Sequence, residues 1–202
     1  MNRIIYVARS QGFTLMELLV TLVVAGILMG VGAPSFEQAM ANSRQTAVYN
    51  SLVGSMRLAR SEAIKQSGSV AVCARASSTS NTCGADWNEG WLVFTDGGVT
   101  PGVIDDTEIL LRVEKQTTGN IEVDNKALLQ NNASEPINRP FIRFGPRGTS
   151  NWRGAGTYQF CDRRGTDHAL AINITLSGDV RKARRNDTNV LLDAFQAPVT
   201  CP

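Results

Sequence analysis

The sequence predicts an α+β protein in which a long N-terminal helix packs on a mainly antiparallel β domain. An apolar run at residues 13–34 leads into a stretch up to residue 66 whose hydrophobic residues recur at three- and four-residue steps, the spacing of an amphipathic helix. Beyond residue 67, short β-rich runs alternate with Gly, Asn, Asp and Pro, as in antiparallel sheets. We therefore expect four segments: residues 1–12, 13–34, 35–66 and 67–202.

The first twelve residues form a short basic segment that ends in glycine. Arg3 and Arg9 are its charged residues, and Gly12 directly precedes the apolar run. That run has about the 20 residues needed to cross a bilayer, and the arginines place its start in the cytoplasm and the bulk of the chain outside. Cleavage after Gly12 would remove the charges and leave the apolar helix as the new N-terminus. We therefore predict that residues 1–12 are a cleaved leader.

Removal of this leader changes the charge of the protein. The whole sequence has a formal net charge of +2, but without Arg3 and Arg9 the Lys and Arg count falls from 20 to 18 and equals the 18 Asp and Glu residues. A neutral protein has no general attraction to nucleic acid or anionic lipid. Any such binding would have to come from a local patch.

Glu17 is the acidic residue of the apolar run. A carboxylate inside a membrane span costs about 2.5–3.5 kcal/mol on insertion scales, so it calls for a positively charged partner. Cleavage after Gly12 would create one, the amino group of Phe13. We predict that Glu17 pairs with such a group in an assembly.

The junction of Gly12 with the following FTLMELL resembles the leader junction of type IV pilins and type II secretion pseudopilins. The resemblance implies that a prepilin peptidase cuts between Gly12 and Phe13 and methylates the amine of Phe13. It also implies that Glu17, the fifth residue after the cut, neutralises the amine of an adjacent subunit. The implied partners are this peptidase, other minor and major pilins, and an inner-membrane assembly platform.

The amphipathic segment at residues 35–66 is expected to pack its apolar stripe against the domain that follows. Arg57, Arg60 and Lys65 are expected on its solvated face. The stripe consists of Phe36, Met40, Val48, Leu52, Met56, Ala59 and Ala63. Eight short strands are expected after it, at residues 70–73, 91–94, 109–113, 121–123, 141–144, 158–161, 169–174 and 180–182. Trp87 and Trp91 are expected in the core, the default place for large aromatic side chains.

Four cysteines lie in the β domain, and none forms a CxxC pair. An even number in an exported chain indicates two disulfides and an oxidising compartment such as the periplasm. Three pairings are possible. We favour Cys73 with Cys83 and Cys161 with Cys201, because a polar, turn-rich stretch separates the first two.

Motifs of the β domain carry a second resemblance, to the minor-pilin branch that contains pseudopilin H (GspH-like proteins), FimT and FimU. It rests on SMRLARSEAIKQ, WNEGWLVFTDGG, IDDTEILLRV, FIRFGPRGTSNWRGAGTYQFC and ITLSGDVR, which together span nearly the whole chain. Some FimT proteins bind DNA through a C-terminal Gly-Arg-x-Arg motif in this region. Here Gly178 and Arg181 match that motif, but Asp179 occupies the first arginine position, where a carboxylate repels phosphate. A solvated hairpin is the alternative interpretation, and the candidate DNA-binding residues are Arg181, Lys182, Arg184 and Arg185.

Catalysis and metal binding are not expected. The one histidine, His168, offers no Ser-His-Asp or Cys-His arrangement, no glycine-rich nucleotide loop follows a strand, and we place His168 at the end of a strand. The acidic residues around Gly97 fit no calcium-loop spacing; they are Asp96, Asp105, Asp106 and Glu108. We therefore expect no enzyme activity, no metal and no cofactor.

These observations predict a minor pilin or pseudopilin that is anchored in the bacterial inner membrane by one span, with its C-terminal domain in the periplasm. Its expected role is structural, in the initiation or tip assembly of a type IV pilus. Two alternatives remain open at this point. One is a DNA-binding minor pilin for DNA uptake, and the other is a pseudopilin of a type II secretion system.

Overall fold

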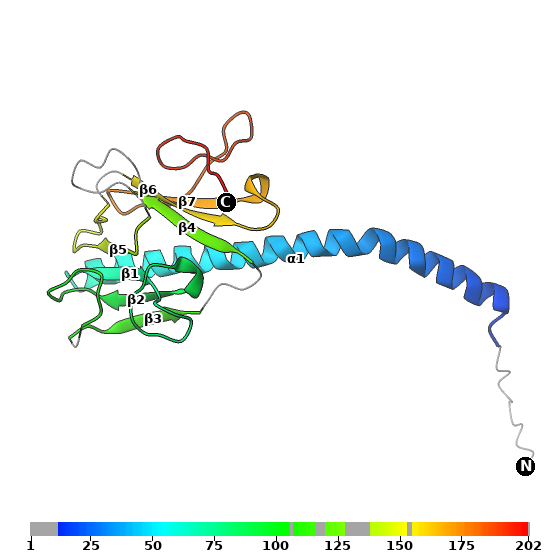
Figure 1. Cartoon of the computed structure of the whole chain (residues 1–202), viewed down its shortest axis with the longest axis horizontal. Coiled ribbons are helices and arrows are strands. Elements are labelled where there is room, and N and C mark those ends of the chain that lie inside the picture. The colour runs from blue at the N-terminus through cyan, green and yellow to red at the C-terminus, as the bar shows by residue number, and fades with distance from the viewer. Residues whose placement is uncertain (1–11, 106, 116–119, 128–137, 153–154, 202) are drawn as a thin grey trace, which may run out of the picture. The chain divides into compact units, whose positions relative to one another are not determined.

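The computed structural model describes residues 12–105, 107–115, 120–127, 138–152 and 155–201, and for residues 31–34 it describes the backbone alone. Of the leader predicted at residues 1–12, only Gly12 lies within the described part. In this described part, one long helix is followed by eight strands with two short 3₁₀ helices among them (Figure 1). Their bounds are α1 (Leu15–Lys65), β1 (Val70–Ala74), η1 (Trp87–Glu89), β2 (Trp91–Thr95), β3 (Leu110–Glu114), β4 (Glu122–Ala127), β5 (Phe141–Phe144), β6 (Ala155–Cys161), η2 (Thr166–His168), β7 (Leu170–Thr175) and β8 (Val180–Lys182).

The chain divides into two compact units, Met1–Ala41 and Asn42–Pro202. The second unit contains the C-terminal part of α1 together with all the strands. The helical segment expected at residues 35–66 is thus shared between the two units.

In the first unit, α1 starts after Thr14, whose side-chain oxygen accepts a hydrogen bond from the Glu17 backbone N–H at 3.2 Å. A threonine in this position satisfies one of the free N–H groups of the first turn. The helix contains an 18-residue window with a mean hydropathy of 2.2, long and apolar enough to cross a membrane, and none of that window is buried. Its exposed large apolar side chains include Leu15, Met16, Leu22, Ile27, Leu28 and Met29.

In the second unit, the strands form two four-stranded sheets with the orders β3-β2-β1-β5 and β4-β6-β7-β8. All the pairings between these strands are antiparallel. Every predicted strand is present, and the predicted α+β class is confirmed. The division into two separate sheets was not predicted.

Strand β4 is longer than the predicted run at 121–123 because polar residues continue it. Asn125 is fully buried, yet it donates to the carbonyl oxygen of Arg139 at 2.8 Å and accepts from the Arg139 backbone N–H at 2.7 Å. A buried amide that is fully hydrogen-bonded can occupy a core position. An alternation of apolar residues therefore does not reveal this strand.

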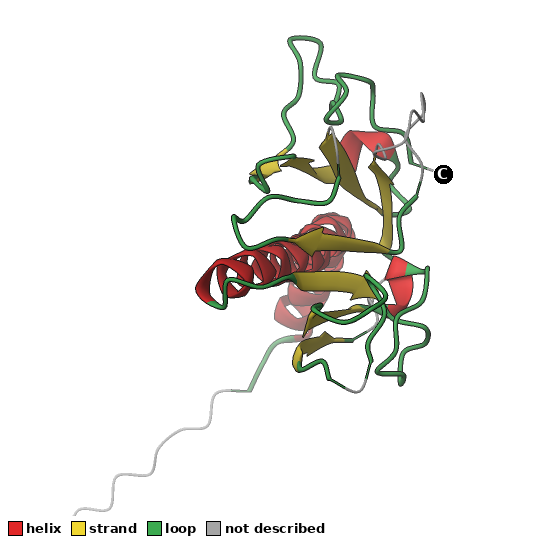
Figure 2. Ribbon diagram, turned by 90° about the vertical axis from the view of Figure 1, so that its left-hand side faces the viewer, coloured by secondary structure: helices red, strands yellow, loops and turns green. Residues whose placement is uncertain are grey.

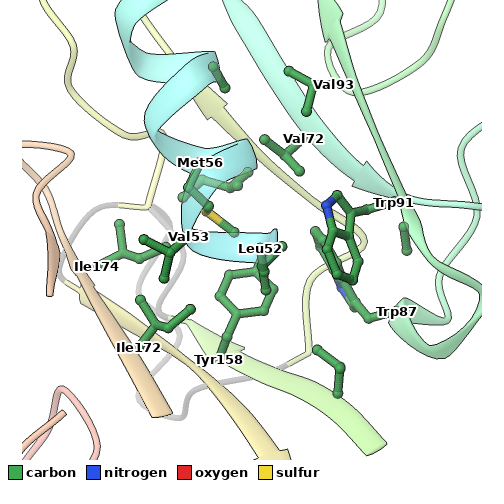
Figure 3. Close-up of a cluster of buried hydrophobic side chains, with 14 of the residues drawn as sticks. Leu52, Val53, Met56, Val72, Trp87, Trp91, Val93, Tyr158, Ile172 and Ile174 are labelled. Atoms are coloured by element: carbon green, nitrogen blue, oxygen red, sulfur yellow. The ribbon is translucent and has the colours of Figure 1, made fainter. Parts of the chain in front are cut away.

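The C-terminal part of α1 lies between the two sheets and forms one core with both of them (Figure 2). Leu52 and Met56 are fully buried and, with Val53, lie between Val72 and Val93 of the first sheet and Ile172 and Ile174 of the second (Figure 3). The predicted core positions of Trp87 and Trp91 are confirmed, with side chains only 1% and 2% exposed. Trp91 donates from its indole nitrogen to the hydroxyl of Ser55 at 2.9 Å.

The predicted apolar stripe is only partly buried. Leu52, Met56, Ala59 and Ala63 have no exposed surface, and Val48 packs partly buried against the same core. Phe36 and Met40 belong to the first unit and are exposed there. His168 lies in η2 rather than at a strand end.

Candidate functional site

The three residues of the predicted processing and assembly site lie together at the start of the described chain. Gly12 and Phe13 precede α1, and Glu17 lies in its first turn. The Phe13 side chain is 83% exposed, and no charged group among the described residues pairs with the Glu17 carboxylate. The carboxylate is therefore available for a partner outside this chain.

Two disulfides are present in the β domain. Cys73 in β1 is joined to Cys83 with an S–S distance of 2.06 Å, and Cys161 at the end of β6 is joined to Cys201 at 2.04 Å. Cys161 belongs to a small second core with Ala171, Leu191 and others, against which Cys201 packs. This disulfide therefore fastens the C-terminal segment to the second sheet.

The four candidate DNA-binding cations differ in what their side chains contact. Arg181, Lys182 and Arg184 line one cleft of about 820 Å³. Arg185 instead donates to the backbone carbonyl oxygens of Asn189 at 2.9 Å and Asp167 at 2.8 Å. Its guanidinium thus holds the C-terminal loop against the segment before β7.

Asp179, at the first arginine position of the Gly-Arg-x-Arg pattern, binds two arginines of its own chain. Its carboxylate accepts hydrogen bonds from Arg181 and from Arg60 of α1. The hydrogen bond and charge of Arg181, followed by the charge of Arg60, lower the pKa of Asp179. Arg60 also donates to the carbonyl oxygen of Gly148 at 3.1 Å. The expectation that Arg60 belongs to a solvated face is therefore wrong.

Arg57, one helical turn before Arg60, contributes to the cleft instead. Its side chain is exposed and lines the same cleft as Arg181, Lys182 and Arg184. The C-terminal loop supplies the rest of the lining, including Asp193 and Gln196. Sequence reasoning did not connect Arg57 with the C-terminal cations, because more than 100 residues separate them and no local pattern links the two segments.

A second polar network joins α1 to the end of β6. Gln45 is 2% exposed and donates to the carbonyl oxygen of Phe160 at 2.9 Å. Arg164 donates to the Gln45 side-chain oxygen at 3.3 Å and to Asn42 at 2.6 Å, while it also pairs with Asp162 at 2.6 Å. Burial by itself would raise the pKa of Asp162, but the hydrogen bonds and charge of Arg164 outweigh it, so that the pKa is lowered.

The acidic loop near Gly97 is a structural element. The Asp96 carboxylate is fully buried, lies 3.0 Å from Nε of Arg143 and accepts from the Gly102 N–H at 3.1 Å. Burial raises the pKa of Asp96 against the lowering effect of Arg143. Glu108 accepts from the backbone N–H groups of Gly98 and Asp105, and Asp106 lies outside the described residues. Among the described residues, no group of three or more His, Cys, Asp or Glu side chains is arranged to hold a metal ion.

Two family models match the chain. The model of the type II transport protein GspH matches residues 49–178, and the model of the prokaryotic N-terminal methylation motif matches residues 7–33. The chain belongs to the GspH family. The resemblance to minor pilins and pseudopilins is thereby confirmed, as is the methylation motif that contains Gly12, Phe13 and Glu17.

The solved structures similar to this GspH-family chain include two crystal forms of the type IV minor pilin FimU from Pseudomonas aeruginosa PAO1. Both are 19% identical to it. The first has a TM-score of 0.48, and the match covers 84% of this chain and 98% of the FimU chain. The second has a TM-score of 0.47, and the match covers 81% of this chain and 98% of the FimU chain. No protein with a curated description matches the chain. The GspH match ends at Gly178, so the cleft residues from Val180 onward lie beyond it.

Proposed function

We propose that this GspH-family protein is a non-enzymatic structural subunit, a minor pilin that takes part in the initiation or tip assembly of a type IV pilus. The observation that carries the proposal is an unburied apolar helix of bilayer length with Glu17 four residues after Phe13. A buried carboxylate in such a span is stabilised by a cation, and the methylation-motif match supports the cut that would create one.

In this proposal, the leader of residues 1–12 is removed by a prepilin peptidase and Phe13 becomes the methylated N-terminus. The span at residues 13–34 holds the subunit in the bacterial inner membrane, with residues 67–202 in the periplasm. The two disulfides support this location, because oxidising compartments are where such bonds persist. The helix later leaves the membrane and packs among other minor and major pilins, delivered by an inner-membrane assembly platform.

Of the two alternatives, DNA binding has less support from the site, whereas the secretion role shares it. DNA binding through the C-terminal cations is weakened because Arg181 is paired with Asp179 and Arg185 is bound to backbone carbonyls. A role in a type II secretion pseudopilus shares the same anchor and fold, and the GspH name of the family keeps it as the main rival.

The test is complementation of a strain that lacks the gene. We expect the deletion to reduce surface pili, and we expect wild type and Glu37→Ala to restore them while Glu17→Ala does not. Glu37 is a matched control, since it is an exposed carboxylate on the same helix beyond the apolar run. Loss of exoprotein secretion with normal piliation in the deletion strain would overturn the pilus role, and full restoration by Glu17→Ala would overturn the pairing.

A further inference from the structure

The edge strand β8 of the second sheet carries backbone hydrogen-bonding groups that no described residue is seen to use. β8 is the last strand of the order β4-β6-β7-β8. The Thr175 N–H donates to the carbonyl oxygen of Asp179, and the Ala183 N–H donates to the carbonyl oxygen of Ala171. The backbone N–H and C=O groups of Asp179 and Ala183 therefore face β7. Because successive residues of an antiparallel strand turn their N–H and C=O groups to opposite sides, those of Val180 and Lys182 point off the open edge.

The C-terminal loop covers this edge only from Arg184 onward. The carbonyl oxygen of Arg184 accepts from the Leu192 N–H at 3.0 Å, which continues the ladder there. Before that point the edge borders the cleft, whose lining contains the five consecutive residues from Val180 to Arg184. Up to four backbone groups, the N–H and C=O of Val180 and Lys182, are therefore offered to an added strand.

The side chains around this edge give the cleft a positive charge. Arg57, Lys182 and Arg184 line it, and none of the three is in an ion pair with another described residue. Asp193 also lines the cleft, and one oxygen of its carboxylate, Oδ1, accepts from the backbone N–H groups of Phe195 and Ala197. Charged residues on an edge strand commonly prevent indiscriminate pairing, and here they would repel a basic strand and attract an acidic one.

Resting on the proposed role as a pilus subunit, we propose that this cleft binds an extended acidic segment of a neighbouring subunit, which adds to β8 as a further strand. The backbone of the segment pairs with Val180 and Lys182, and its carboxylates meet Arg57, Lys182 and Arg184. Strand addition of this kind takes affinity from main-chain hydrogen bonds and specificity from side chains. A nucleic acid fits less well, because its phosphates would face the two edge carbonyl oxygens, which need donors.

Fluorescent peptides of about eight residues, long enough to pass the edge and both flanks, provide the probes. The full mature chain in detergent micelles is titrated with alternating Glu-Val, Gln-Val and Lys-Val peptides and with a single-stranded oligothymidylate. We expect the Glu-Val peptide to bind, and the Gln-Val peptide to bind at least about tenfold more weakly because the charge complementarity is lost. Binding should weaken as salt rises.

Two pairs of variants separate charge from strand addition. Arg57→Gln with Arg184→Gln should weaken Glu-Val binding at least about tenfold, whereas the exposed pair outside the cleft, Arg44→Gln with Arg163→Gln, should leave it unchanged. Lys182→Pro removes an N–H that faces the open edge and breaks no bond to β7. The Lys182→Pro variant should bind the Glu-Val peptide at least about threefold more weakly than Lys182→Ala, which loses the same charge but keeps the N–H.

Amide hydrogen exchange gives a readout that charge attraction alone would not change. The Glu-Val peptide should slow exchange at Val180 and Lys182. Equal affinity of Lys182→Pro and Lys182→Ala without slowed exchange would overturn strand addition. Binding of the oligothymidylate in place of the Glu-Val peptide, or no binding of either, would overturn the acidic-segment proposal, while correct processing at Phe13 and assembly through Glu17 would be unaffected.

Discussion

Arg60 and Asp179 form an ion pair between α1 and the turn before β8, with 3.3 Å between Nη1 and Oδ1. The same guanidinium donates to the carbonyl oxygens of Gly148 and Ser177 at 3.1 and 2.9 Å. One helical side chain thus fastens two turns that follow strands of different sheets. Arg57, one turn earlier, is exposed and lines the cleft instead.

The first prediction compares these two arginines. Arg60→Ala should lower the free energy of unfolding by about 1–2 kcal/mol, since it leaves the part-buried carbonyl oxygen of Gly148 without this donor. Arg57→Ala should change it by less than about 0.5 kcal/mol, because exposed arginines contribute little. Urea unfolding followed by circular dichroism measures both. Equal effects of the two changes would contradict the anchoring role of Arg60.

The second prediction concerns the disulfides. Alkylation without reduction should find no free thiol, and peptide mapping should link Cys73 to Cys83 and Cys161 to Cys201. The sequence separations are 10 and 40 residues, so loop-closure entropy predicts that the second bond stabilises the protein by about 1 kcal/mol more.

Thermal unfolding of the two double Cys→Ala variants tests this order. The variant without Cys161–Cys201 should also lose the cleft wall formed by the C-terminal loop, because that loop packs in the small core of this disulfide. A crossed linkage pattern, or a greater loss without Cys73–Cys83, would contradict the prediction.

The third prediction follows from the lowered pKa of Asp162. Its ordinary value is 3.8, and the Arg164 hydrogen bonds hold the folded value below that. A carboxyl group with a depressed folded pKa contributes stability that is fully present above the unfolded pKa and is lost as the pH falls through the folded pKa. Asp162→Asn should therefore destabilise the protein at pH 7 by about 1–2 kcal/mol, and the difference from wild type should shrink below pH 3.8.

Urea midpoints measured from pH 7 to pH 3 check this dependence, with Asp167→Asn as the control. Asp167 is exposed, lies five residues further on and has no ion pair among the described residues. A constant difference between Asp162→Asn and wild type over the whole range would mean that the Asp162 carboxylate charge is not what stabilises the network.

The fourth prediction is the mature N-terminus. Intact-mass analysis of membrane-extracted protein should give a chain that begins at Phe13 with one added methyl group. Gly12 presents no side chain to a peptidase that must hold an extended backbone closely, so Gly12→Leu should leave the leader attached. A chain that starts at Met1, or at a residue beyond the apolar run, would contradict both the cleavage and the proposed assembly.

The sequence alone determined the local elements of this protein. The apolar run, the three- and four-residue spacing after it and eight short β-rich runs predicted α1 and every strand, because each pattern is complete within a few residues. The same holds for Trp87 and Trp91, whose size makes burial the default. Strand β4 was predicted too short because the hydrogen bonds that allow Asn125 to be buried come from Arg139, which no local pattern reveals.

Only the tertiary structure decided how these elements combine. The two sheets lie on either side of one helix and share a core with it. The Arg60–Asp179 pair and the Gln45–Phe160 hydrogen bond each join residues that lie more than 100 positions apart. The cleft arises in the same way, since Arg57 of α1 meets the open edge of β8 there. Whether an arginine is solvated, bound to a carbonyl or exposed in a cleft depends on which distant atoms the fold places beside it, and the spacing of residues along the chain does not contain that information.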